Sequence, residues 1–262
     1  MVTIGELING MYTVVGKAIV EKDKKAIQKI AKEQVEQGAD VLDVNTGPVA
    51  KDPVDAMKWL TETIQEVVSV PLCFDSTKAA VIEAGLQLAK GKSIINSTTA
   101  DDEKLNKLLP LAKKYNAQII GLTLDKSGVP KDRHKRSEHA LKIISSCMEH
   151  DIPLDDVYID PIVMPVNVAQ PQAMELLESL REFQVISDPP PKTVVGLSNV
   201  SQGTKDRSLI NRTFLVMAIA FGLSAAIVDP LDKELMDAMI TSELILNKSI
   251  YCDSYLNAYR KK

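Results

Sequence analysis

The chain has 262 residues, 45% of them hydrophobic, and a formal net charge of −4 at pH 7, so it is long enough for one domain with a sizeable core. Its 31 basic residues are scattered, which argues against nucleic-acid binding, and no stretch approaches the roughly 18 uninterrupted apolar residues of a membrane span. The three cysteines lie far apart with no C-x-x-C pair, which favours a reducing cytoplasm without disulfides.

Eight short apolar runs alternate with helical stretches along the chain. In the first half, Gly38 is expected to end the first helix, Pro53 to lie in the first turn of the second, and Ser76 or Thr77 to cap the third. The elements expected there, strand and helix in turn, span residues 2–6, 15–37, 39–44, 53–68, 71–75, about 77–91, 93–96 and about 101–115.

The second half repeats this order. A charged loop precedes the helix after the fifth strand, and Pro161 and Pro165 enforce a loop after the sixth. The elements expected there are strands at residues 118–122, 157–160, 193–196 and 225–229 and helices after residue 133, at about 171–186, after 209 and at about 232–246, with a further short helix near 255.

The apolar runs are short and continuous, as in parallel strands that are covered on both faces. Eight such units predict an α/β fold of the (β/α)₈ TIM-barrel type, with residues 1–262 as a single domain. A doubly wound sheet is the competing architecture, but no G-x-G-x-x-G motif follows a strand.

A polar residue ends each apolar run, and the carboxyl ends of all barrel strands point to one face. We expect Asp75, Asn96 and Asp160 to meet in one pocket and to bind the N–H groups of a ligand, although each alone could cap a helix. We expect Asp43, Asn45 and Asp229 to cap a helix or to support neighbouring side chains. The run ends are Glu6, Asp43 and Asn45, Asp75, Asn96, Thr123, Asp160, Asn199 and Asp229.

The seventh strand is followed by Gly-Leu-Ser-Asn-Val-Ser-Gln over residues 196–202, and then by Lys205 and Arg207. Together with Asp-Ser-Thr at 75–77, Ile-Asn-Ser-Thr at 95–98 and Ile-Asp-Pro at 159–161, this segment resembles the methyltetrahydrofolate:corrinoid/iron-sulfur protein methyltransferases of acetogens. The likeness also includes Gly-Glu-Leu-Ile-Asn-Gly at 5–10 and Asn-Arg-Thr-Phe at 211–214, so it spans the whole chain.

The resemblance implies a pterin-binding barrel, a homodimer and a place in the acetyl-CoA pathway of carbon fixation. It implies that Asp75, Asn96 and Asp160 hold the pterin ring and that Asn199 faces N5 of the folate. From the same loop we assign further substrate-binding roles to Gly196, Ser198, Gln202 and Arg207. Arg207 and its neighbour Lys205 are candidates for contact with the folate's glutamate carboxylates.

The implied reaction moves the N5-methyl group of 5-methyltetrahydrofolate to the Co(I) centre of a corrinoid iron-sulfur partner protein. Asn199 cannot titrate usefully, but its amide can hydrogen-bond N5 as the transition state forms. We expect no metal or corrinoid on this chain: no histidine falls at a strand end, and Asp132-x-His134-x-x-Ser137 lacks the glycine of a corrinoid motif.

Two other functions remain open at this point. A dihydropteroate synthase would share the barrel but would need an anion-binding segment of the Ser-Arg-Lys type after the seventh strand. This chain has Ser198-Asn199-Val200 there. A non-catalytic folate-binding module is the second alternative. The placement of Asn199 opposite N5 argues against it, because storage requires no help to the transition state.

Overall fold

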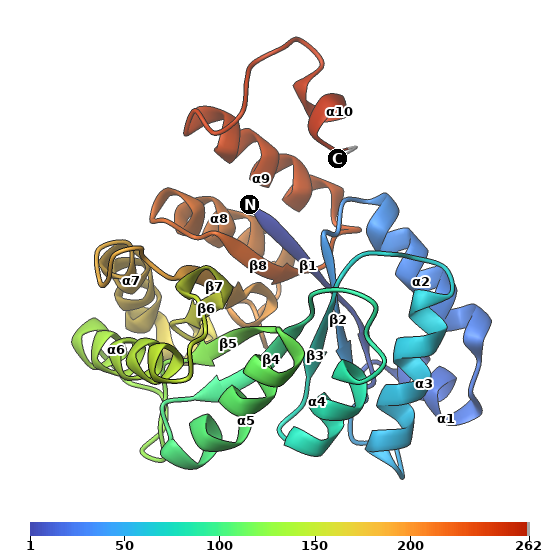
Figure 1. The fold of residues 1–262 in the computed structure, drawn as a ribbon. Coiled ribbons are helices and arrows are strands. Elements are labelled where there is room, and N and C mark those ends of the chain that lie inside the picture. Colours follow the sequence, from blue (N-terminus) through green and yellow to red (C-terminus); the bar gives the residue numbers. More distant parts are fainter. Residues whose placement is uncertain (261–262) are drawn as a thin grey trace.

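The computed structural model describes residues 1–260, which form a closed barrel of eight parallel strands surrounded by helices (Figure 1). The strands are β1 Val2–Asn9, β2 Val41–Asn45, β3 Leu72–Asp75, β4 Ile94–Thr99, β5 Gln118–Leu122, β6 Val157–Asp160, β7 Lys192–Gly196 and β8 Ala225–Val228. The α-helices are α1 Thr13–Glu21, α2 Lys24–Glu36, α3 Pro53–Gln65, α4 Ala79–Leu86, α5 Asp102–Tyr115, α6 Arg133–Glu149, α7 Val166–Phe183, α8 Arg207–Ala220, α9 Lys233–Ile245 and α10 Tyr255–Tyr259. The predicted TIM barrel is confirmed.

Barrel closure follows from the strand pairing. Each strand pairs in parallel with its chain neighbours, and β1 pairs with both β2 and β8, so the sheet has no edge. One buried cluster fills the inside of the barrel with one side chain from each strand, and larger clusters pack the outer faces of the strands against the helices. The inner cluster consists of Ile4, Val41, Cys73, Ile94, Ile120, Tyr158, Val194 and Ala225.

Two predictions about the starts of helices are wrong. The helix expected over 15–37 is two helices, because Lys22 takes a left-handed φ of 55° and Asp23 accepts a hydrogen bond from Ala26 N to cap α2. Neither Ser76 nor Thr77 caps α4, which begins after Lys78 without a side-chain cap. The helix expected from about residue 171 is preceded by a short helical segment that begins at Val166, and the two join across a kink at Ala169.

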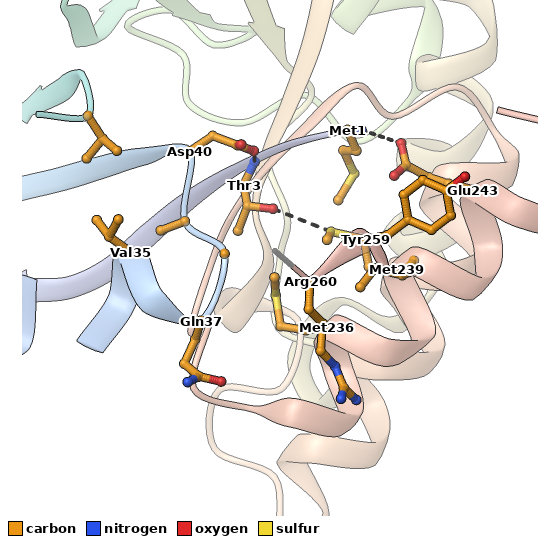
Figure 2. A pocket seen from close by; sticks show the side chains of 14 residues that line it. Met1, Thr3, Val35, Gln37, Asp40, Met236, Met239, Glu243, Tyr259 and Arg260 are labelled. Atoms are coloured by element: carbon orange, nitrogen blue, oxygen red, sulfur yellow. Dashed lines mark hydrogen bonds and ion pairs between the residues drawn. The ribbon is translucent and has the colours of Figure 1, made fainter. Parts of the chain in front are cut away.

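The two ends of the barrel differ in construction. We call the end where the strands finish the carboxyl pole and the end where they begin the amino pole. At the amino pole, β1, the α2–β2 loop, α9 and α10 enclose a cavity of about 200 Å³. Figure 2 shows its contacts: the Met1 amine pairs with Glu243, Thr3 N donates to Asp40, and Thr3 Oγ1 donates to Met239. Its polar groups are thus mostly engaged by the protein itself.

Candidate functional site

Strand register brings the polar residues of β2, β3 and β4 into one layer. The Cα of Asn45 is the register partner of Asp75, and Asp75 is in turn the partner of Asn96. Two strands further round, Asp160 ends β6 beside Leu122 of β5. Because each residue is the last or nearly the last of its strand pairing, the three predicted pterin ligands Asp75, Asn96 and Asp160 lie at the carboxyl pole.

Two amide–carboxylate contacts orient this layer. Asn45 Nδ2 donates to Asp75 Oδ2 at 2.7 Å, and Asn96 Nδ2 donates to the fully enclosed Asp43 at 3.0 Å. Asp43 and Asn45 therefore support their neighbours, and neither caps a helix. These contacts engage the amide nitrogen of Asn96 and one carboxylate oxygen of Asp75, so that the Asn96 carbonyl oxygen and the second Asp75 oxygen remain as acceptors for a ligand.

Asp160 is held from the backbone. Its Oδ1 accepts a hydrogen bond from Ile162 N at 2.7 Å, and the backbone N–H of Gly196 also acts to lower the pKa of this carboxyl group. Burial nevertheless raises the pKa of Asp160 to about 7, because these donors and the charge of Arg136 offset only part of the desolvation cost. Thr123 does not present its hydroxyl to a ligand, since Thr123 Oγ1 donates to the Asp160 carbonyl at 3.1 Å.

The loop after β7 places Asn199 next to this group. Asn199 is exposed, and its carboxamide makes no hydrogen bond within residues 1–260. A Cβ on Gly196 would lie 3.1 Å from Asn199 Nδ2, so the glycine leaves room for the amide. Gly196 thus contacts both Asp160 and Asn199, which explains why a glycine ends β7.

The rest of that loop is tied to the first strand and to α8. Ser198 Oγ donates to Glu6 Oε1 at 2.6 Å, across 192 positions of sequence. Arg207 donates from Nε to Ser201 Oγ and from Nη2 to the Ser198 carbonyl. Arg207 therefore stabilises the loop, and its role toward a ligand stays a prediction, as does that of the exposed Gln202.

Buried and half-buried carboxyl groups with raised pKa values gather at the carboxyl pole. Desolvation is the largest cause in each case; a second carboxylate, Asp75, also raises the pKa of Asp43, whereas the Ser198 hydroxyl partly offsets the effect at Glu6. Such a site favours ligands that donate N–H groups. Glu6 was left out of the predicted binding set, although its place at the end of the first run was a usable signal. The five groups are Glu6, Asp43, Asp75, Asp160 and Asp229.

A cavity of about 400 Å³ opens beside Asn45 and Asp75, between the loops that follow β1, β2 and β3. Its size is in the range of small-molecule pockets. Within residues 1–260, no three His, Cys, Asp or Glu side chains are arranged to hold a metal ion, and no helix is long and apolar enough to cross a membrane.

Solved structures similar to this one support the fold. A dihydropteroate synthase from Yersinia pestis superposes with a TM-score of 0.73 at 17% identity and covers 95% of this chain and 94% of that one. The enzyme from Coxiella burnetii, solved with pteroic acid, gives a TM-score of 0.69 at 18% identity, covering 93% and 94% of the two chains. At these identities the likeness concerns the barrel alone.

Sequence comparison is more specific. A methionine synthase from Mycobacterium tuberculosis is 29% identical over 81% of this chain, which corresponds to 19% of that longer protein. A methylcorrinoid:tetrahydrofolate methyltransferase from Eubacterium limosum is 30% identical over the whole chain and 97% of its own length. The family model for pterin binding enzymes matches residues 14–229. The chain therefore belongs to the pterin-binding enzyme family, and this relative, matched from end to end, is by name a methyltransferase.

Proposed function

We propose that this enzyme transfers a methyl group between N5 of tetrahydrofolate and the cobalt of a corrinoid carried by a partner protein. The observation that carries the proposal is the layer of Asp75, Asn96 and Asp160 with the unengaged amide of Asn199 beside it. The direction that we propose is from 5-methyltetrahydrofolate to Co(I). The same site serves the reverse reaction, the direction in which the name of the Eubacterium limosum relative is written.

The pterin ring suits the acceptors at the carboxyl pole. Its ring N–H and exocyclic NH₂ groups form an edge that one carboxylate can accept with both oxygens, and we assign that edge to Asp160. Asn96 offers a carbonyl oxygen because Asp43 already engages its amide nitrogen. Asp75, oriented by Asn45, supplies a further acceptor. The ring thus provides hydrogen-bond donors to carboxyl groups that have few such donors within the protein.

Methyl transfer breaks the C–N5 bond. The electron pair of that bond stays on N5, which takes up a proton, while Co(I) supplies the pair for the new Co–C bond and becomes Co(III). An amide hydrogen bond from Asn199 to N5 stabilises the nitrogen as negative charge develops. Burial is the main cause that raises the pKa values of Glu6 and Asp75, so these carboxyl groups hold a proton more readily than free ones.

The proposed partner is a corrinoid iron-sulfur protein, as the sequence resemblance given above implies, and residues 1–260 contain no cluster of three His, Cys, Asp or Glu side chains that could hold a metal ion. The corrinoid is therefore treated as a substrate delivered by another protein. A homodimer and a role in the acetyl-CoA pathway belong to the same proposal and rest on the sequence resemblance given above.

The test is turnover with the purified chain. Reduced corrinoid iron-sulfur protein and 5-methyltetrahydrofolate are mixed anaerobically, and loss of the Co(I) absorption and formation of methyl-Co(III) are followed. We expect stoichiometric transfer that depends on the enzyme. Tight folate binding without transfer to any corrinoid protein would favour the binding module, and condensation of a pterin with p-aminobenzoate would favour a synthase.

A further inference from the structure

The cavity beside Asp75 has two chemically different halves. Its inner wall is formed by Asn45 and Asp75, which belong to the proposed pterin site. Its outer wall carries two exposed lysines, Lys51 on the β2–α3 loop and Lys78 before α4. Neither ammonium group makes an ion pair or hydrogen bond within residues 1–260. The only other charged group on the lining is Asp75 itself, so the outer half is positively charged.

The walls of this cavity are preformed. Asn45 accepts a hydrogen bond from Gly47 N at its Oδ1 and one from Gly10 N at its backbone carbonyl. Gly47 has a φ of +63°, and a Cβ there would come within 2.4 Å of the Gly10 backbone, so the two loops are in direct contact. Ser76 Oγ accepts from Lys78 N, which holds the opposite wall. A ligand therefore meets an ordered surface rather than one that must fold around it.

Charge at the carboxyl pole is arranged in two zones. Asp43, Asp75 and Asp160 form an acidic floor that suits the N–H groups of a pterin. The lysine wall lies at one side of that floor and suits an anion. In addition, α4 begins at this wall without a side-chain cap, so the positive end of its dipole faces the same region. A ligand with a neutral, N–H-rich head and an anionic tail matches both zones.

We propose that Lys51 and Lys78 bind the glutamate carboxylates of the folate, and that this cavity makes the enzyme prefer folates with several glutamates. The proposal rests on the proposed function, because it takes the pterin to be bound by Asp75 and its neighbours. It differs from the expectation drawn from sequence, which placed the tail at Lys205 and Arg207. The guanidinium of Arg207 is already engaged by Ser198 and Ser201.

The experiment compares binding of three ligands by calorimetry: a tetrahydropterin without a tail, tetrahydrofolate monoglutamate and tetrahydrofolate triglutamate. We expect wild type to bind the triglutamate about fivefold more tightly than the monoglutamate at low salt, with the gain shrinking at high salt. Lys51→Ala/Lys78→Ala should abolish that gain and leave affinity for the tail-free pterin unchanged.

Two variants complete the design. Lys25→Ala/Lys32→Ala removes the same charge from the exposed face of α2 and should keep the gain. Lys205→Ala tests the competing position of the tail. The proposal is overturned if wild type shows no gain, if the Lys51 and Lys78 double variant keeps it, or if Lys205→Ala alone removes it. Absence of binding by all three ligands would instead overturn the proposed function.

Discussion

The two poles of the barrel treat their carboxyl groups in opposite ways. At the amino pole three acids have cationic partners: Asp156 pairs with Lys92 at 2.6 Å, Asp237 with Arg260, and Glu243 with the Met1 amine. At the carboxyl pole the five buried or half-buried acids form no salt bridge within residues 1–260, and desolvation raises their pKa values. Matched charges hold the amino pole together, whereas the unmatched acids of the carboxyl pole leave interactions for a ligand.

The largest expected effect is on the rate of methyl transfer. Asn199→Ala removes the proposed hydrogen bond to N5, which becomes stronger as the methyl group leaves. The single-turnover rate should therefore fall about 10²–10³-fold at saturating folate. Folate affinity should change much less. Stopped-flow transfer to reduced corrinoid protein measures the rate. A normal saturated rate with a raised half-saturation concentration would make Asn199 a binding residue instead.

The next effect contrasts stability with binding. The folded-state pKa of Asp160 is raised to about 7, above the ordinary value near 3.9, so its carboxylate costs stability as pH rises through 7. Asp160→Asn should therefore stabilise the protein by about 2–4 kcal/mol at pH 8 and have little effect at pH 4. It should also abolish bidentate acceptance of the pterin edge. Urea denaturation at both pH values, with folate titrations, measures the two effects.

The matched variant at the amino pole should behave in the opposite way. Asp156→Asn breaks the pair with Lys92 and should lower stability while leaving folate affinity unchanged, because Asp156 lies at the opposite end of the barrel. If Asp160→Asn lowered stability at pH 8, or if Asp156→Asn raised it, the contrast between matched and unmatched acids would be wrong.

A smaller effect is expected from Asn96. Asn96→Ala removes an acceptor for the pterin and also the donor to Asp43, so folate affinity should fall by about 1–3 kcal/mol. The measurement is calorimetric titration of folded protein, with the far-ultraviolet spectrum as a check on the fold. Unchanged affinity would place the pterin away from β4.

The smallest effect is expected at the segment from α9 to Arg260, which lines the cavity at the amino pole. Asp237→Asn weakens the contact from α9 to Arg260 after α10, a partly exposed pair, and should cost about 0–1 kcal/mol of stability. Neither methyl transfer nor folate affinity should change. A loss of transfer in this variant would mean that the two poles are coupled.

The sequence by itself determined the barrel and the ends of its strands. Continuous apolar runs and the polar residue after each are properties of chain order, so Asp75, Asn96 and Asp160 were placed correctly at the carboxyl pole before any contact was known. The break between α1 and α2 was missed because the helical pattern continues through it, although Asp23 was a local signal for a new helix start.

Tertiary structure alone decided which polar groups meet. The pairing of Asn45 with Asp75 and of Asp43 with Asn96 depends on strand register, and the contact of Ser198 with Glu6 depends on closure of the barrel. The raised pKa of Asp160 depends on burial among residues distant in sequence. Lys51 and Lys78 look like ordinary surface lysines in the sequence, and only the packing of three loops makes them one wall of a cavity.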